Sequence, residues 1–302
     1  MQFHYPGSRI LRRPIDIPPA YSLIQKKDLS LLLRDDYRSL LLQTGIGDIK
    51  MLLKKHGKPL SHLVGRIPHM AVSLSDGKRL VVRRYSHGGL LQSLTRDLYL
   101  LGSRGFEELI LTEGIRSSGI ATVQPVGAIH QRVFPFFYRA YFLSIEIPGA
   151  RDLSSYFQTM GPHPCAERLI EKRRMIRSVG RLVRQFHEAG FFHRDLQLKN
   201  ILASEGKPFL IDFDRSYRKS TLTLKERIEN LLRLNRSAEK WKRAGLPITK
   251  TDRWRFFLAY SGEDEQLREA LRNALRKLGF YAFFHPWFWA LKGGQQYQTK
   301  KH

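Results

Sequence analysis

The spacing of apolar residues divides the chain into a strand-rich part and a helical part. Short apolar runs between turn residues are typical of strands, whereas apolar residues recurring every three or four positions are typical of helices. The first pattern dominates up to residue 147 and the second follows Pro148 and Gly149. The first part is predicted to contain strands at residues 70–74, 80–83, 123–129 and 141–146, with one helix at 104–117.

A long helix is the clearest element of the second part. Four apolar residues share one face of a helix predicted over residues 167–189, and Gly190 supplies a residue that tolerates the positive φ of a helix end. Two further amphipathic, basic helices are predicted at residues 222–242 and 263–278.

Residues 1–58 are predicted to be an extension ahead of these two parts. Pro14, Pro18 and Pro19 favour an irregular start, and residues 23–54 have helix-like apolar spacing. The sequence therefore predicts an α+β protein of two lobes. Its segments are an N-terminal extension at 1–58, a β-rich N-lobe at 59–147 and a helical C-lobe at 148–302.

The stretch that follows the long helix carries the strongest chemical pattern. Residues 193–200 read His-Arg-Asp-Leu-Gln-Leu-Lys-Asn, which matches the catalytic loop of protein kinases, H-R-D-L-x-x-x-N. Asp-Phe-Asp follows at 212–214, where such enzymes carry the metal-binding D-F-G. The pattern predicts Asp195 as the catalytic base, with Asn200 and Asp212 holding Mg²⁺ on the phosphates of ATP.

The spacing between these residues predicts how they meet. Two short apolar runs flank Ser204, Glu205 and Gly206, which is a turn signal. A two-residue turn at Glu205 and Gly206 would pair Asn200 with Ile211. Asp212 would then lie one residue beyond the pair, so both metal ligands reach one ion from the open end of a hairpin.

A kinase also needs a cation on the α- and β-phosphates, held by a helix carboxylate. Arg83 ends a predicted strand where a protein kinase has lysine, and Glu108 on the next helix is its predicted partner, whereas Glu107 would point elsewhere. Arg66, in a poor glycine loop, is predicted to contact phosphate. Glu146 is predicted to lie where a hinge offers backbone groups to adenine, although an ordinary strand end fits it equally well.

Two features separate this chain from protein kinases. Asp214 replaces the glycine of D-F-G and is predicted to pair with the adjacent Arg215, although metal ligation is an alternative. No A-P-E follows, and residues 215–230 run almost directly into a helix. A long activation loop does not fit there, which favours a small or lipid-linked acceptor over a protein.

Charge narrows the choice of partner. The 302 residues include 52 Lys and Arg against 27 Asp and Glu, a net charge of +25, which suits an anionic partner.

A single cysteine, Cys165, excludes an intramolecular disulfide. We see no signal peptide, and no run reaches the roughly 20 apolar residues of a membrane span. A cytoplasmic protein, soluble or peripheral to a membrane, is expected.

Two further stretches allow alternative interpretations. Residues 280–291 are aromatic and flanked by lysines, which is typical either of a membrane interface or of a tail docked on its own core. Gly88 and Gly89 either let backbone approach a ligand or form a plain loop.

Taken with these motifs, the chain resembles the bacterial lipopolysaccharide core kinases, and among them the 3-deoxy-D-manno-octulosonic acid (Kdo) kinases. The resemblance rests on Arg-Arg-Tyr-Ser-His-Gly-Gly at 83–89, Arg-x-Phe-x-Glu at 104–108, Asp-Phe-Asp-Arg at 212–215 and the stretch 230–237. It implies a protein-kinase-like fold, ATP and Mg²⁺ as cofactors, and Asp195 as the base. It also implies a Kdo-lipid A or core glycolipid as acceptor at the anionic cytoplasmic face of the inner membrane.

Other functions remain open at this stage. A heptose kinase of the same family is the near alternative to a Kdo kinase. A catalytically weak, kinase-like binding protein would normally lack Asn200 or one of the carboxylates, and all are present. Nucleic acid is not expected as a partner, because no nucleic-acid-binding module is recognisable.

Overall fold

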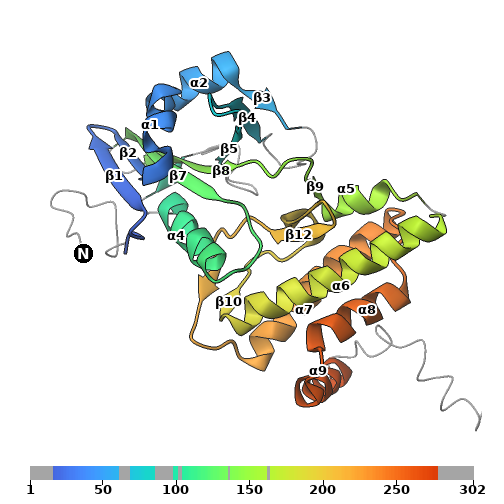
Figure 1. Ribbon diagram of the computed structural model, residues 1–302. Coiled ribbons are helices and arrows are strands. Elements are labelled where there is room, and N and C mark those ends of the chain that lie inside the picture. The colour runs from blue at the N-terminus through green and yellow to red at the C-terminus, as the bar shows by residue number, and fades with distance from the viewer. Residues whose placement is uncertain are drawn as a thin grey trace, which may run out of the picture.

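The computed structural model describes residues 16–60, 69–85, 98–100, 104–134, 137–161 and 164–277. Arg66, the pair Gly88 and Gly89 and the aromatic stretch 280–291 lie outside the described residues. Within the described part, a sheet with three helices precedes a mainly helical half (Figure 1). No helix there is long and apolar enough to cross a lipid bilayer.

An antiparallel sheet forms the first half. Its order among the described strands is β1-β2-β7-β8-β5-β4-β3, and β6 pairs with β8. The pairing of β4 with β5 confirms the predicted hairpin. The strands are β1 (Tyr21–Lys26), β2 (Leu29–Arg34), β3 (Lys58–Pro59), β4 (Met70–Ser73), β5 (Arg79–Arg84), β6 (Tyr99–Leu100), β7 (Pro125–Phe134) and β8 (Phe137–Ile145).

Helices pack on both faces of this sheet. The short helices α1 (Asp35–Gln43) and α2 (Ile49–His56), joined by the turn η1 (Ile46–Asp48), share one hydrophobic core with it. Helix α4 (Arg104–Ser117) shares a second core through Phe106 and Leu109. The bounds of α4 are those predicted from the sequence, so the helix that carries Glu108 is confirmed.

The prediction of a helix from residue 23 is wrong for its first part, because residues 21–34 form β1 and β2. In β2, Leu31 and Leu33 face one core while Leu32 faces the other. A strand buried on both faces is a continuous apolar run, and such a run does not show the alternation of a half-buried strand. The sheet thus includes residues before position 58, and the division into an extension and two lobes stays a prediction.

The second half packs helices around one large core. The long helix α6 (Ala166–Glu188) confirms the predicted helix and contacts α8 (Lys250–Ser261) most extensively. Gly190 has a φ of +81°, and a Cβ there would collide with the Lys219 carbonyl oxygen, so only glycine fits this helix end. The other helices are α5 (Leu153–Gln158), α7 (Leu224–Arg243) and α9 (Glu265–Lys277).

Short strands line the boundary between the two halves. A small sheet has the order β12-β11-β9, and β10 (Phe191–Phe192) pairs with β13 (Tyr217–Arg218). The Leu210 N–H donates to the Ala121 carbonyl oxygen at 3.0 Å, which ties this region to the chain that follows α4. The remaining strands are β9 (Arg151–Asp152), β11 (Ile201–Ser204) and β12 (Lys207–Leu210).

Candidate active site

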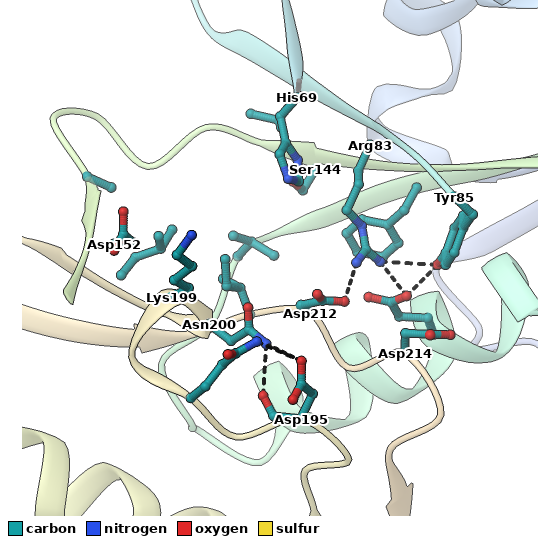
Figure 2. Close-up of a pocket in the computed structure, with 18 of the residues that line it drawn as sticks. His69, Arg83, Tyr85, Ser144, Asp152, Asp195, Lys199, Asn200, Asp212 and Asp214 are labelled. Carbon is teal, nitrogen blue, oxygen red and sulfur yellow. Dashed lines mark hydrogen bonds and ion pairs between the residues drawn. The ribbon is translucent and has the colours of Figure 1, made fainter. Parts of the chain in front are cut away.

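A cavity of about 850 Å³ lies where the two halves meet (Figure 2). Its walls come from β5 and β8 on the sheet side, and from the catalytic loop, the end of β12 and α7 on the helical side. Asp195, Asn200, Asp212, Arg83 and Glu108 all line it. Glu146 lines it as well, so the structure brings six of the predicted site residues into one cavity.

The hairpin of β11 and β12 has the predicted register. Ser204 pairs with Lys207, and both turn residues, Glu205 and Gly206, have positive φ, as a tight two-residue turn requires. At the open end, the Ile211 N–H donates to the Asn200 carbonyl oxygen at 3.0 Å. Asn200 and Asp212 consequently lie at the mouth of one hairpin.

Asn200 is oriented by the loop that carries Asp195. It ends the short turn η2 (Leu198–Asn200), and its Nδ2 donates to the Asp195 carbonyl oxygen at 2.8 Å. Since the amide nitrogen is used in this way, the side-chain oxygen remains for a ligand.

His193 links the catalytic loop to the end of β12. The Asp195 N–H donates to His193 Nδ1 at 3.1 Å, so that nitrogen carries no proton. Nε2, 3.0 Å from the Ile211 carbonyl oxygen, is then the donor of the second bond. Burial lowers the pKa of His193, which keeps the ring neutral. The ring therefore fixes the positions of Asp195 and Asp212 relative to each other.

The Asp195 side chain is open to the cavity. About half of it is exposed, with a relative accessibility of 52%. Gln197 Nε2 donates to Asp195 Oδ2 at 2.7 Å, and Arg233 Nη1 on α7 lies 3.8 Å from Asp195 Oδ1. A hydroxyl entering the cavity can thus reach a carboxylate whose orientation is restrained from two sides.

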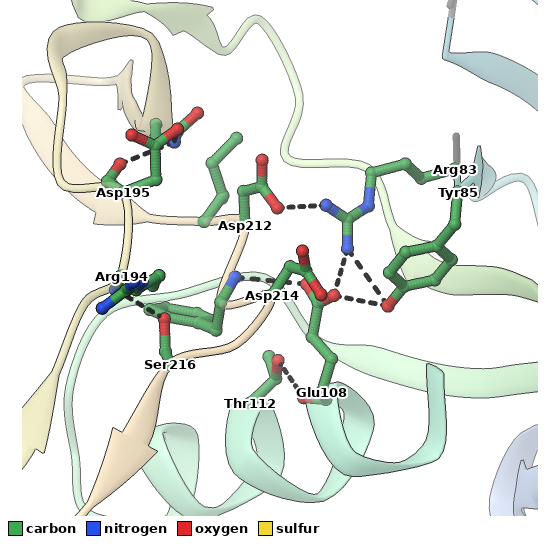
Figure 3. Close-up of polar contacts among 12 residues, drawn as sticks. Arg83, Tyr85, Glu108, Thr112, Arg194, Asp195, Asp212, Asp214 and Ser216 are labelled. Carbon is green, nitrogen blue, oxygen red and sulfur yellow. Dashed lines mark hydrogen bonds and ion pairs between the residues drawn. The ribbon is translucent and has the colours of Figure 1, made fainter. Parts of the chain in front are cut away.

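Arg83 is paired with two carboxylates (Figure 3). It contacts the buried Glu108 on α4, which confirms the predicted partner, and also Asp212. Burial would raise the pKa of Asp212, but the Arg83 guanidinium lowers it below its usual range, so this carboxylate is ionised. Tyr85 Oη donates to Glu108, and burial raises the pKa of that tyrosine.

Glu108 also holds the backbone after Asp212. The Phe213 N–H donates to Glu108 Oε1 at 3.2 Å. Burial raises the pKa of Glu108, although the Arg83 charge opposes this effect. One carboxylate on α4 therefore positions both the Arg83 side chain and the Asp212 loop.

Asp214 does not pair with Arg215, so that prediction is wrong. Its carboxylate is held in a two-pronged ion pair by Arg104, at the start of α4. Arg215 has a φ of +57°, so the backbone turns in the left-handed region directly after Asp214. The two residues of the actual pair are 110 positions apart, and both are partly buried.

Glu146 lines the cavity just beyond the end of β8. Its side chain forms an ion pair with Arg79 at 3.0 Å, and its N–H donates to the Arg79 carbonyl oxygen at 2.9 Å. Because that N–H is already bonded to the first residue of β5, an adenine at this edge would need neighbouring backbone groups.

The donors at the hairpin mouth fit a magnesium ion. Mg²⁺ prefers oxygen ligands and is commonly held by one or two side chains together with substrate phosphates and water. Asn200 offers an amide oxygen and Asp212 an ionised carboxylate. The described residues contain no cluster of three or more His, Cys, Asp or Glu suited to a metal, so a site built only from the protein is not evident there.

Four residues of the site were given no individual role in the sequence analysis: Tyr85, Arg104, Gln197 and Arg233. Tyr85 had a usable signal, because it lies two residues after Arg83 and side chains two apart on an extended chain share a face. Gln197 bonds Asp195 two positions earlier in the same loop, whereas Arg104 and Arg233 reach their partners only through folding, and no local pattern identifies those partners.

The chain is similar to known proteins along most of its length. The model of the lipopolysaccharide kinase (Kdo/WaaP) family matches residues 51–260. A 3-deoxy-D-manno-octulosonic acid kinase of Vibrio cholerae is 33% identical over 192 residues, which cover 62% of this chain and 76% of that protein. The enzyme of the same name from Pasteurella multocida is 33% identical over 197 residues, 62% of this chain and 78% of that protein.

A solved structure supports the fold. WaaP in complex with acyl carrier protein superposes with a TM-score of 0.51 at 18% identity, over 82% of this chain and 98% of that chain. The two-lobe, protein-kinase-like fold predicted from the sequence is thereby confirmed. With a family model covering residues 51–260 and a relative that is 33% identical over 192 aligned residues, this chain belongs to the lipopolysaccharide kinase (Kdo/WaaP) family.

Proposed function

We propose that this chain transfers the γ-phosphoryl group of ATP to a hydroxyl of Kdo in the inner core of lipopolysaccharide. Its family membership makes it a phosphotransferase acting on a sugar hydroxyl. The observation that carries the proposal is the convergence of Asp195, Asn200, Asp212 and the Arg83–Glu108 pair on one open cavity. The relatives named as Kdo kinases favour Kdo as the acceptor sugar.

Each group has a distinct part in the transfer. Asp195 orients the acceptor hydroxyl and takes its proton. Asn200 and Asp212 would hold Mg²⁺, which supplies charge neutralisation between the phosphates when it is bound. Arg83, held by Glu108, binds the α- and β-phosphates. Phosphoryl transfer depends mostly on such positioning and charge stabilisation, so these few groups suffice.

The remaining nucleotide contacts follow from the walls of the cavity. The end of β8 at Glu146 would receive the adenine through adjacent backbone groups. Arg66 stays a predicted phosphate contact, since it lies outside the described residues.

The net charge of +25 supports peripheral attachment to the anionic cytoplasmic face of the inner membrane, where a lipid-linked acceptor resides.

The choice of acceptor tests this function. The purified protein is incubated with labelled ATP and either a Kdo-lipid A precursor or a heptosylated core glycolipid, and mass spectrometry locates the new phosphate. The proposal predicts a phosphate on Kdo with either acceptor. Phosphate found only on heptose would make the chain a heptose kinase, and Mg-ATP binding without transfer to either acceptor would contradict both activities.

A further inference from the structure

We infer that the face of α7 turned toward the cavity is the acceptor subsite, and that its cations bind the carboxylate and phosphate groups of an anionic glycolipid. This inference rests on the proposed function and assigns the side of the cavity from which the acceptor enters. It concerns residues for which neither the sequence pattern nor the nucleotide chemistry provides a role.

Helical spacing places the cavity-lining residues of α7 on one face. They recur at intervals of three and four positions, which brings side chains together along one side of a helix. The residues are Arg233, Arg236, Ser237, Lys240 and Trp241.

The cations of this face lack carboxylate partners at short range. Among the described residues, the side chains of Arg236 and Lys240 make no hydrogen bond or ion pair. Arg233 has only distant contacts, 3.8 Å to Asp195 and 4.0 Å to Glu229. Its Nε is buried without a hydrogen-bond partner in the described structure. A buried donor without an acceptor is unusual, and a bound anion would satisfy it.

The cations on the nucleotide side differ in this respect. Arg83 is bonded to Glu108 and Asp212, and Arg104 to Asp214. Arg83 contacts Asp212, whereas Arg233 approaches Asp195. One group of cations thus lies beside Asp212, and the other lies beside Asp195. This arrangement suits a transfer in which the donor phosphates lie against Arg83 and the acceptor lies against α7.

Helix α7 is fixed to the catalytic loop. The Asn230 side chain accepts a hydrogen bond from the His193 N–H and donates one to the His193 carbonyl oxygen, both at 3.0 Å. The Leu198 N–H donates to Ser237 Oγ at 3.1 Å, and the Lys199 ammonium lies 5.4 Å from the centre of the Trp241 ring. A sugar bound to α7 would therefore keep a constant position relative to Asp195.

The length of the face suits a ligand with several charges. Arg233 and Lys240 are seven positions apart, which is about 10 Å along a helix with a rise of 1.5 Å per residue. Arg233 is close enough to Asp195 to hold a carboxylate on the sugar being phosphorylated. Arg236 and Lys240 lie one and two turns farther on, where they would bind charges elsewhere on the glycolipid.

Steady-state kinetics of Arg236→Gln and Lys240→Gln test the subsite. Both residues are exposed, so neither change should lower the midpoint of thermal unfolding. Each change is expected to raise KM for the Kdo-lipid A acceptor about 10-fold, as loss of one charged hydrogen bond does, and to leave KM for ATP within twofold. Lys242→Gln is the matched control, because it removes an exposed cation of α7 that does not line the cavity.

The outcomes separate the inference from the function on which it rests. An active wild-type protein whose acceptor KM is unchanged in both variants would contradict the inference alone. An equal rise in KM for ATP, or the same effect in Lys242→Gln, would also contradict it. If the wild-type protein phosphorylates no acceptor, the proposed function is contradicted, and so is the inference that α7 forms its acceptor subsite.

Discussion

Arg83 shows how one side chain organises the sheet side of the cavity. Its guanidinium contacts Glu108 and Asp212 together, and it lies over the ring of Tyr85 at 4.8 Å from the ring centre. Arginine can make two such contacts at once because its donors form a planar fork, whereas lysine offers a single point charge. Arginine at this position is therefore a geometric requirement of the cluster.

Replacement of Arg83 by lysine tests this requirement. Arg83→Lys keeps the charge but cannot span both carboxylates, so we expect KM for ATP to rise about 10-fold and kcat to fall. Arg132→Lys, which changes an exposed arginine outside the cavity, should leave both constants unchanged. Wild-type kinetics in Arg83→Lys would mean that the double pairing has no role in catalysis.

The residue scale also shows the limit of sequence reasoning. Asn200, Asp212 and the Arg83–Glu108 pair could be predicted, because a known spacing and one strand–helix succession define them. The partner of Asp214 could not be predicted. Proximity in the sequence favoured Arg215, whereas folding brings Arg104 to Asp214 from 110 positions away.

At the scale of elements, α4 is held in place by the segment that follows β12. Asp214 anchors the first turn of α4 through Arg104, and the Phe213 N–H binds Glu108 one turn later. This chain has no room for a long activation loop. These bonds to residues 213 and 214 therefore hold α4, and with it Glu108, in place. Asp214 is thus a positioning residue in this account.

A double-mutant cycle measures that anchor. Asp214→Asn and Arg104→Gln should each lower the free energy of unfolding by about 2 kcal/mol, as expected for a partly buried ion pair. The double variant should be destabilised by less than the sum, and each single variant should lose activity. Additive effects in urea unfolding would show that the two residues do not stabilise α4 through each other.

Two elements show why some structure was not predicted. Strands β1 and β2 were assigned to a helix because β2 is buried on both faces and shows no alternation. Helix α8 was not predicted, although Thr249 and Asp252 form a capping box at its start. That four-residue signal was available in the sequence and marks a helix start independently of periodicity.

At the scale of the whole molecule, buried histidines couple stability to pH. His130 stacks on Phe106 with ring centres 4.0 Å apart, and burial lowers its pKa to about 3. In the unfolded chain the pKa is about 6.5, so between these values only the unfolded state binds the proton. The free energy of unfolding therefore rises with pH across this range. The stabilisation that comes from the low pKa of His130 is lost progressively as the pH falls below about 6.5.

His130→Phe tests this coupling, because phenylalanine can keep the stack but cannot bind a proton. Between pH 7.5 and 5.5, the wild-type protein should lose about 1.4 kcal/mol more of its unfolding free energy than the variant. Urea unfolding at the two pH values gives the difference. An identical pH dependence in both proteins would mean that His130 binds a proton as readily in the folded state as in the unfolded state.

The most direct test of the account is the separation of phosphoryl transfer from nucleotide binding in Asp195→Asn. Removal of a general base typically costs 10²- to 10⁴-fold, so transfer to the Kdo-lipid A acceptor should fall by about 10³-fold. Mg-ATP affinity should stay within about twofold of wild type, because Asn200, Asp212 and Arg83 are unchanged. Transfer at the wild-type rate, or a matching loss of Mg-ATP affinity, would contradict the assignment of Asp195 as the base at the mouth of the hairpin.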